Sequence, residues 1–333
     1  PDARLNFAQN LLRRNDDTPA MVFRGEDKVR DEVSWRELGD KVSRLHQAFR
    51  DFGIKPGDRV CAVMPNMPET IMAFAGANSL GAVWSSCSPD FGERGILDRF
   101  GQIEPNVLIV CDGYYYNGKT FDVTDKIEQV VNGLPTLRKV IVVNYTGNAA
   151  ATVARLPNAV TFDDFIEAYA PGPIDFTMLP FDHPLYILFS SGTTGVPKCI
   201  VHSTGGVLLK HLCEHQLHGG ISPGDRLFYF TTCGWMMWNW LASALASEAT
   251  LMLFDGSPFA PSETVLFDYA DQERFAVFGT SAKFIDAVKK TGWRPMDTHS
   301  LASVRAIMST GSTLVPESFE FVYEAIKQDV HLA

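Results

Sequence analysis

The sequence has 333 residues, enough for about two domains with sizeable cores. Apolar residues make up 46% and charged residues 20%, a balance that excludes an intrinsically disordered chain. The formal net charge of −10 at pH 7 argues against nucleic acid or an anionic membrane surface as the main partner.

Cysteine usage and hydropathy predict a soluble, cytoplasmic protein. The six cysteines are scattered, without a C-x-x-C pair or a short disulfide framework, as is usual in a reducing compartment. The first residues lack the apolar core of a signal peptide. The most apolar stretch, 236–254, is interrupted by polar residues and is more typical of a buried helix and strand than of a membrane span.

Residues 1–143 predict a first α/β subdomain. A hairpin over 20–34 comes first, and Ser34 and Glu37 then form a capping box that opens a helix ending at Gly53. Apolar strands separated by helices follow and indicate a parallel sheet covered on both faces. The strands are expected at 59–64, 82–85, 107–111 and 140–143, and the helices at 69–80, 93–103 and 124–131.

A second α/β subdomain is expected over 183–333, after a connecting insert at 144–182 that breaks the alternation. The predicted fold class is therefore α/β, with two stacked, doubly wound and mostly parallel sheets between layers of helices (αβαβα). The second set of strands is expected at 185–189, 227–230, 250–254, 276–278 and 304–309, and its helices at 205–216, 238–246, 261–270, 282–290 and 316–326.

A loop rich in serine, glycine and threonine follows the strand at 185–189 directly. Glycines in such a loop let the backbone approach a ligand and present N–H groups as an anion nest, while a lysine adds a point charge for a polyphosphate. The loop is not a Walker A sequence, because Gly-Lys-Ser/Thr is absent at the required spacing. A mobile surface loop is the alternative interpretation. The residues concerned are Ser190, Ser191, Gly192, Thr193, Thr194, Gly195, Val196, Pro197 and Lys198.

This loop resembles the signature of the adenylate-forming superfamily, which includes acyl-CoA synthetases, adenylation domains of peptide synthetases and luciferases. Segments 33–38, 53–60 and 78–83 are also similar to family motifs, so the resemblance covers essentially the whole chain. It implies a large N-terminal domain of two αβα sheets with a distorted barrel, followed by a small C-terminal lid. It also implies that ATP and a carboxylic acid form an acyl-adenylate, from which the acyl group passes to CoA.

The resemblance assigns roles to individual residues and implies ATP, Mg²⁺ and CoA as cofactors, with no metal site of the protein's own. Lys198 and Thr194 would be catalytic, because they orient the phosphates and neutralise their charge. The turn Gly311-Ser312-Thr313 is similar to the one that contacts adenine, although family members often carry Gly-Glu-Pro there. An ordinary turn is the alternative at that place. The nucleotide is expected to contact Ser190, Ser191, Gly192, Thr193, Thr194, Gly195, Lys198, Gly311, Ser312 and Thr313.

The segment 232–240 most closely resembles the acetoacetyl-CoA synthetases within this superfamily. In those relatives it lines the acyl pocket, so Trp235, Met236, Met237 and Asn239 are expected to contact a short acid. A Trp/Met-rich helix start that is simply core is the alternative. The resemblance implies a ligase that forms acetoacetyl-CoA from acetoacetate, ATP and CoA. Another short-chain acyl-CoA synthetase, for acetate or propionate, is the second candidate.

Three histidines give a hypothesis of a different class. His211, His215 and His218 lie at i, i+4 and i+7 of a predicted helix and could bind a metal, with Glu214 as a base. The pattern is not H-E-x-x-H, so ordinary helix histidines are the simpler interpretation. A module that binds a nucleotide without catalysing a reaction is a third hypothesis.

The chain starts without methionine and stops where a strand begins, which is typical of an N-terminal fragment. By the resemblance, the Thr-Glu that holds Mg²⁺, the ribose-binding Asp and the lid with its catalytic Lys would follow Ala333. The expected partners are the acid, ATP, CoA and the missing lid domain, and neither nucleic acid nor a membrane. The chain alone is expected to be inactive.

Overall fold

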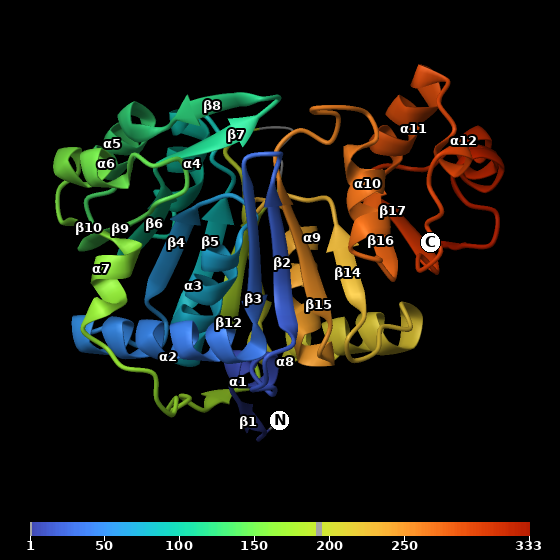
Figure 1. Ribbon diagram of the computed structural model, residues 1–333. Coiled ribbons are helices and arrows are strands. Elements are labelled where there is room, and N and C mark those ends of the chain that lie inside the picture. Colours follow the sequence, from blue (N-terminus) through green and yellow to red (C-terminus); the bar gives the residue numbers. More distant parts are fainter. Residues whose placement is uncertain (1, 191–194) are drawn as a thin grey trace.

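Two seven-stranded sheets form the frame of the protein in the computed structural model, which describes residues 2–190 and 195–333. Figure 1 shows the sheets next to each other, with helices packed around them. The expected α/β class with two mostly parallel sheets is confirmed.

The first sheet has the strand order β10-β9-β6-β4-β5-β12-β13, and its strands are parallel except β13, which runs antiparallel to β12. Its central strands are almost fully buried, because helices pack on both faces. The strands are β4 (Arg59–Val63), β5 (Val83–Cys87), β6 (Val107–Cys111), β9 (Lys139–Val143), β10 (Ala159–Thr161), β12 (Pro184–Phe189) and β13 (Cys199–Ser203).

The helices of the first sheet form two groups. Helix α2 contacts both α3 and α7, whereas α5 contacts both α4 and α6. The capping box predicted for α2 is present, and Gly53 ends this helix with a φ of 89°. The bounds are α2 (Trp35–Phe52), α3 (Pro68–Ser79), α4 (Glu93–Phe100), α5 (Thr124–Asn132), α6 (Ala149–Arg155) and α7 (Phe162–Glu167).

The second sheet has the order β18-β17-β16-β14-β15-β2-β3, and only β3 runs antiparallel to its neighbour in the described sheet. Its strands are β2 (Pro19–Gly25), β3 (Val29–Ser34), β14 (Arg226–Tyr229), β15 (Thr250–Asp255), β16 (Val277–Ser281), β17 (Ala306–Thr310) and β18 (His331–Leu332). Its helices are α8 (Thr204–Leu212), α9 (Met236–Ser243), α10 (Val265–Gln272), α11 (Ala282–Thr291) and α12 (Pro316–Phe321).

Shorter elements complete the fold. Strand β1 (Arg4–Leu5) pairs with β11 (Leu179–Pro180), and β7 (Gly113–Tyr116) forms a hairpin with β8 (Lys119–Asp122). Single turns extend α8, α9 and α12, namely π-helical turns at Cys213–His218 and Val322–Ile326 and a 3₁₀ turn at Ala244–Ser247. The remaining elements are α1 (Phe7–Leu11) and a 3₁₀ turn at Pro295–Asp297. Within the described ranges, none of the helices combines the length and the apolar character that crossing a bilayer requires.

The sheets do not follow the predicted division at residues 143 and 182. The N-terminal hairpin β2–β3 belongs to the second sheet, whereas β12 and β13 belong to the first. Residues 144–182 are not a mere connection, because they contain β10, which extends the first sheet. The physical reason is that β2 is apolar and buried on both faces, and such a strand fits either sheet. Its partner β15 lies far along the chain.

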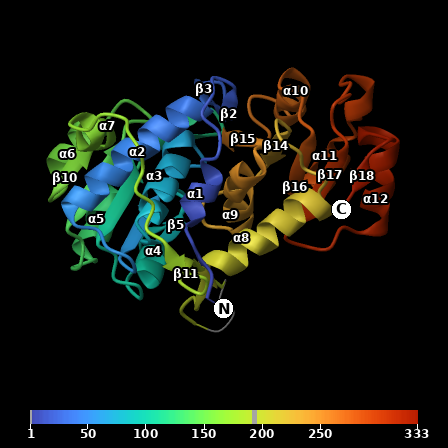
Figure 2. The same cartoon turned by 90° about the horizontal axis from the view of Figure 1, so that it is seen from below.

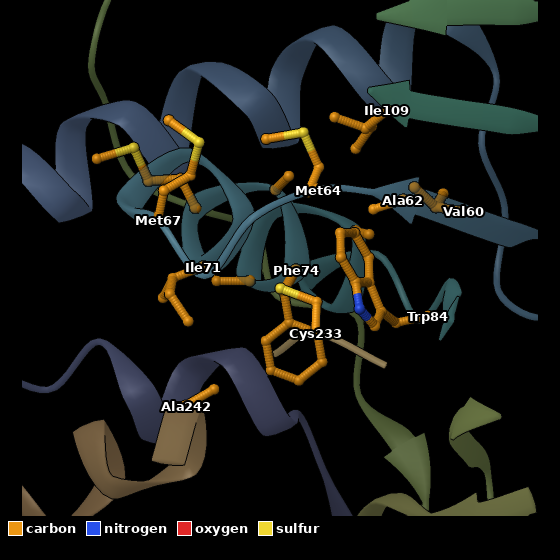
Figure 3. Packing of buried hydrophobic residues seen from close by; sticks show 14 of the residues in the cluster. Val60, Ala62, Met64, Met67, Ile71, Phe74, Trp84, Ile109, Cys233 and Ala242 are labelled. Carbon is orange, nitrogen blue, oxygen red and sulfur yellow. The ribbon is translucent and has the colours of Figure 1, made fainter. Parts of the chain in front are cut away.

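One hydrophobic core joins the two sheets. The rings of Trp84 on β5 and Trp238 on α9 stack with centroids 6.3 Å apart, and Phe74 packs edge-on against both at 5.6 Å. Figure 3 shows Phe74 and Trp84 of the first half beside Cys233 and Ala242 of the second. Each of these residues is fully buried, so neither sheet has a separate core in this region.

Polar contacts also join the sheets near the carboxyl ends of their strands. The carboxylate of Glu26, in the β2–β3 turn, accepts hydrogen bonds from the backbone N–H of Asn117 (2.6 Å), Gly118 (2.8 Å) and Ser257 (2.9 Å). The Tyr145 hydroxyl, just after β9, donates to the carboxylate of Asp255 at the end of β15 over 3.0 Å. The relative position of the sheets is therefore held by hydrogen bonds as well as by apolar packing.

Candidate functional site

The predicted phosphate loop is the tip of the β12–β13 hairpin. Phe189 and Cys199 are paired across the two strands. Beyond them, the backbone N–H of Ser190 donates to the carbonyl of Lys198 at 3.0 Å, and the backbone N–H of Lys198 donates to Ser190 Oγ at 3.2 Å. These bonds close the base of the loop and place the two predicted ends side by side. The predictions for Ser191, Gly192, Thr193 and Thr194 concern residues outside the part of the chain that the structure describes.

The described part of the loop has features that a phosphate site needs. Gly195 has a φ of 143°, a backbone conformation that residues with a side chain rarely adopt. Pro197 then fixes the backbone before Lys198, whose side chain is exposed. From this exposed position the lysine ammonium can reach an anion in solvent.

A cavity of about 700 Å³ lies beside this hairpin. Its walls come from the second half of β13, from α8 and its π-helical extension, from the start of α9, and from the ends of β14 and β17. Figure 2 shows α8 running from the first sheet towards the C-terminal end of the chain. The cavity is mainly apolar, and its volume is in the range of small-molecule sites.

The four residues predicted for the acyl pocket divide into two pairs. Met236 and Met237 line the cavity, together with Trp240, which the sequence did not single out. Trp235 and Asn239 are not among the lining residues. The Trp235 side chain is 58% exposed, whereas Asn239 is buried and its Oδ1 has no hydrogen-bond partner within the described chain. Trp235 caps α9 from outside the helix, whereas Asn239 lies on the buried side of α9.

The turn predicted to contact adenine follows a strand that lines the cavity. Met308, Ser309 and Thr310 of β17 belong to the cavity wall, and Gly311-Ser312-Thr313 comes next in the chain. Gly311 has a φ of 90°, and all three turn residues are exposed. The cavity is thus lined by β13, which follows the predicted phosphate loop, and by β17, which precedes the predicted adenine turn, while the described residues of both segments lie outside its lining.

The three histidines do not form a metal site. His211 Nδ1 lies 2.6 Å from Ser243 Oγ, and His215 Nε2 lies 3.0 Å from the carbonyl oxygen of Trp240. His218 is exposed on the π-helical turn, 3.5 Å from a Glu214 oxygen. In the described ranges, no group of three or more His, Cys, Asp or Glu side chains could hold a metal ion. This geometry contradicts the metallohydrolase hypothesis, because two of the imidazoles are bonded in the interior while the third is exposed on the surface.

Burial keeps the two inner histidines neutral. It lowers the pKa of His211 to about 4 and the pKa of His215 to about 3. At the cavity mouth, a hydrogen bond from Lys210 is the main cause that lowers the pKa of Glu214. The wall is therefore uncharged inside and carries its charged groups at the rim.

Comparison with known proteins identifies the family of this chain. The AMP-binding enzyme family matches residues 7–332. The chain belongs to the AMP-binding enzymes. The acyl-CoA synthetases of the predicted superfamily are confirmed as its relatives by the individual matches.

Several members of this family are similar over the whole chain. Acetoacetyl-coenzyme A synthetase of Rhizobium meliloti (strain 1021) is 62% identical over 335 residues, which is 100% of this chain and 51% of that protein. Acetoacetyl-CoA synthetase of Mus musculus is 44% identical over 99% of this chain and 50% of its own length. Malonamoyl-CoA synthetase of Penicillium aethiopicum is 37% identical over 99% of this chain and 49% of its own length.

A solved structure of a family member supports the fold. Acetoacetyl-CoA synthetase from Streptomyces lividans superposes with a TM-score of 0.93 at 39% identity, covering 100% of this chain and 51% of that one. The chain therefore spans about half the length of the relatives that it matches.

Sequence reasoning missed much of the cavity wall in this AMP-binding enzyme. Strand β13 was not predicted, although it contributes Val201, His202 and Ser203. No apolar run marked this strand, because its residues are exposed or half-buried. Tyr229 and Met308 lie at the ends of predicted strands but carry no local motif, so only the fold brings them together.

Proposed function

We propose that the complete protein is an acid–thiol ligase that forms acetoacetyl-CoA from acetoacetate, ATP and CoA through an acyl-adenylate. One observation carries the proposal: β13, which leaves the phosphate loop, and β17, which leads into the predicted adenine turn, line the same cavity as Met236 and Met237. The names of the bacterial and mammalian relatives agree with it. A cytoplasmic location stays a prediction from the cysteine pattern.

The proposed first step joins the acid to AMP. A carboxylate oxygen attacks the α-phosphorus of ATP, and the bond from this phosphorus to the pyrophosphate oxygen breaks. Lys198 supplies positive charge to the leaving pyrophosphate, and the donors of the loop, with Thr194, orient the phosphates. Mg²⁺ enters with ATP in this proposal. In the second step, the CoA thiolate attacks the acyl carbon, and the bond from that carbon to AMP breaks.

A short β-keto acid suits the cavity wall. Met236, Met237 and Trp240 offer apolar contacts for the carbon chain. Ser309 and Thr310 line the same cavity, and the buried Ser309 Oγ has no hydrogen-bond partner within the described chain. A hydroxyl there can donate to the second carbonyl of acetoacetate, which acetate and propionate lack. This difference favours acetoacetate over the other short acids.

The test is ATP–pyrophosphate exchange by the complete protein with acetoacetate, acetate, propionate, malonamate and a long-chain fatty acid. We expect the fastest exchange with acetoacetate, because its β-carbonyl can accept from the Ser309 hydroxyl and its terminal methyl group suits the apolar wall better than the amide of malonamate does. Faster exchange with acetate or the fatty acid would contradict the substrate. ATP binding without exchange for any acid would instead favour a nucleotide-binding module.

Replacement of Lys198 by alanine tests the loop. We expect exchange to fall by roughly 100-fold or more, because the variant loses a charge that stabilises the departing pyrophosphate. Lys283→Ala, which removes an exposed lysine from α11, is the control and should exchange like the wild type. Unchanged exchange in the Lys198 variant would remove the loop from the proposed mechanism.

A further inference from the structure

The side chain of Gln102 contacts the chain on both sides of Lys198. Gln102 lies two residues beyond α4, and its Nε2 donates to the carbonyl of Pro197 at 2.8 Å. Cys199 Sγ lies 3.8 Å from the other amide atom, Oε1, and can donate to it. A further bond from Nε2 to the carbonyl of Asp98, at 2.6 Å, ties the glutamine to its own helix. One amide therefore connects α4 to the exit of the phosphate loop.

The last turn of α4 also contacts the entry to the loop. The guanidinium carbon of Arg99 lies 6.0 Å from the ring centroid of Phe189, the last residue of β12. The same group lies 4.9 Å from the ring of Phe91, which precedes α4. Arg99 and Gln102 thus touch opposite strands of the hairpin that carries the loop.

The sheet itself gives the tip of this hairpin little support. In the described chain, β12 is paired with β5 at a single position, Tyr186 with Trp84, and Ser85 Oγ donates to the carbonyl of Ile187 at 2.8 Å, so the contacts from β5 stop short of the last two residues of β12. Strand β13 is at the edge of the sheet, and its residues Ile200 and Val201 are 45% and 57% exposed. A hairpin with one weakly paired strand and one free edge needs contacts from outside the sheet to hold its tip in place.

We infer that Gln102 is a positioning residue that fixes the backbone on either side of Lys198 and thereby the place of its ammonium group. The inference rests on the proposed function. Gln102 itself does not reach the substrate; it acts through Pro197, whose carbonyl it binds. Loss of the amide leaves Lys198 present but less ordered. The effect should fall on the nucleotide and not on the acid, since the acid is expected at Met236 and Met237.

The first test is Gln102→Leu in the complete protein, which keeps the volume and removes both hydrogen-bonding groups. In ATP–pyrophosphate exchange, we expect KM for ATP to rise about three- to tenfold, the effect of one neutral hydrogen bond. KM for acetoacetate and the thermal midpoint should stay at the wild-type values. Gln129→Leu, at an exposed glutamine on α5, is the matched control and should leave both KM values unchanged.

The second test separates positioning from general damage. ATP affinity is measured by calorimetry for Gln102→Leu, Lys198→Ala and the double variant. If Gln102 acts through Lys198, the double variant binds ATP as weakly as Lys198→Ala alone, so the two effects are not additive. Additive losses, or an equal rise of both KM values, would assign Gln102 a merely structural role and overturn the inference.

The outcomes also separate this inference from the proposed function. If the wild-type protein exchanges with acetoacetate and the Gln102→Leu variant has the same KM for ATP, only the inference is overturned. A wild-type protein that shows neither exchange nor ATP binding would overturn the proposed function, and the inference with it.

Discussion

Asp255 illustrates how one residue responds to its place between the two sheets. Desolvation raises the pKa of its carboxyl group to about 7, and the negative charges of Glu26 and Asp90 add to the rise. The hydrogen bond from Tyr145 acts in the opposite direction but is weaker. Because an ordinary aspartate has a pKa of 3.8, the folded protein holds this proton to a higher pH than the unfolded chain does.

This difference predicts a pH dependence of stability. Between about pH 4 and pH 7 the unfolded state binds fewer protons at Asp255, so the free energy of unfolding contributed by this residue falls as the pH rises and is level above pH 7. Asp255→Asn removes the titration, so its stability should fall less steeply across that range. Urea denaturation at a series of pH values measures both slopes. The control is Asp182→Asn at an exposed site, and equal slopes for Asp255→Asn and the wild type would contradict the assignment.

Among the elements, helix α2 has the clearest start. Ser34 Oγ accepts from the backbone N–H of Glu37 at 3.2 Å, and the Glu37 carboxylate accepts from the backbone N–H of Ser34 at 2.8 Å. Ser34→Ala should lower the free energy of unfolding by about 1 kcal/mol, because one N–H at the helix start loses its partner. Chemical denaturation measures the change. Ser300→Ala in an exposed loop should have little effect, and an equal loss there would mean that the cap is not the cause.

The elements also show what local sequence can predict. Capped helices such as α2 and apolar strands such as β6 were predicted close to their observed bounds, because caps and burial leave a local pattern. Strand β13 has no such local pattern, because its residues are exposed or half-buried and follow a glycine-rich loop. The same limit applies to the site. Ser190 and Lys198 form a contiguous motif, whereas the cavity wall combines residues such as His202 and Met308, which are distant in sequence.

At the scale of the whole molecule, the shared core makes the two sheets depend on each other. Trp238 is fully buried, stacks on Trp84 and donates to Asn66 Oδ1 at 3.0 Å. Trp238→Ala should lower the free energy of unfolding by about 3–5 kcal/mol, the usual cost of removing a large buried aromatic. Because the rest of the shared core still joins both sheets, the variant should still unfold in one transition.

Calorimetry measures the stability of the Trp238 variant, and circular dichroism in the near and far ultraviolet shows whether it unfolds in one transition. The matched control is Trp235→Ala, because Trp235 is 58% exposed and its loss should change the midpoint little. Two separate transitions in the Trp238 variant, with one sheet stable at the wild-type midpoint, would show that the sheets are independent.

The pairing of β2 with β15 has a consequence for synthesis of the chain. Met21 pairs with Leu251, which lies 230 positions later in the chain. At ribosomal rates, the hairpin β2–β3 emerges roughly 10 to 50 seconds before its partner strand exists. A lone hairpin is marginally stable and presents a free edge during that time. Strand β3 carries the exposed charges Arg30, Asp31 and Glu32, which discourage pairing with a foreign strand. We therefore expect the charges of β3 to protect that edge of the nascent hairpin from association until β15 pairs with β2.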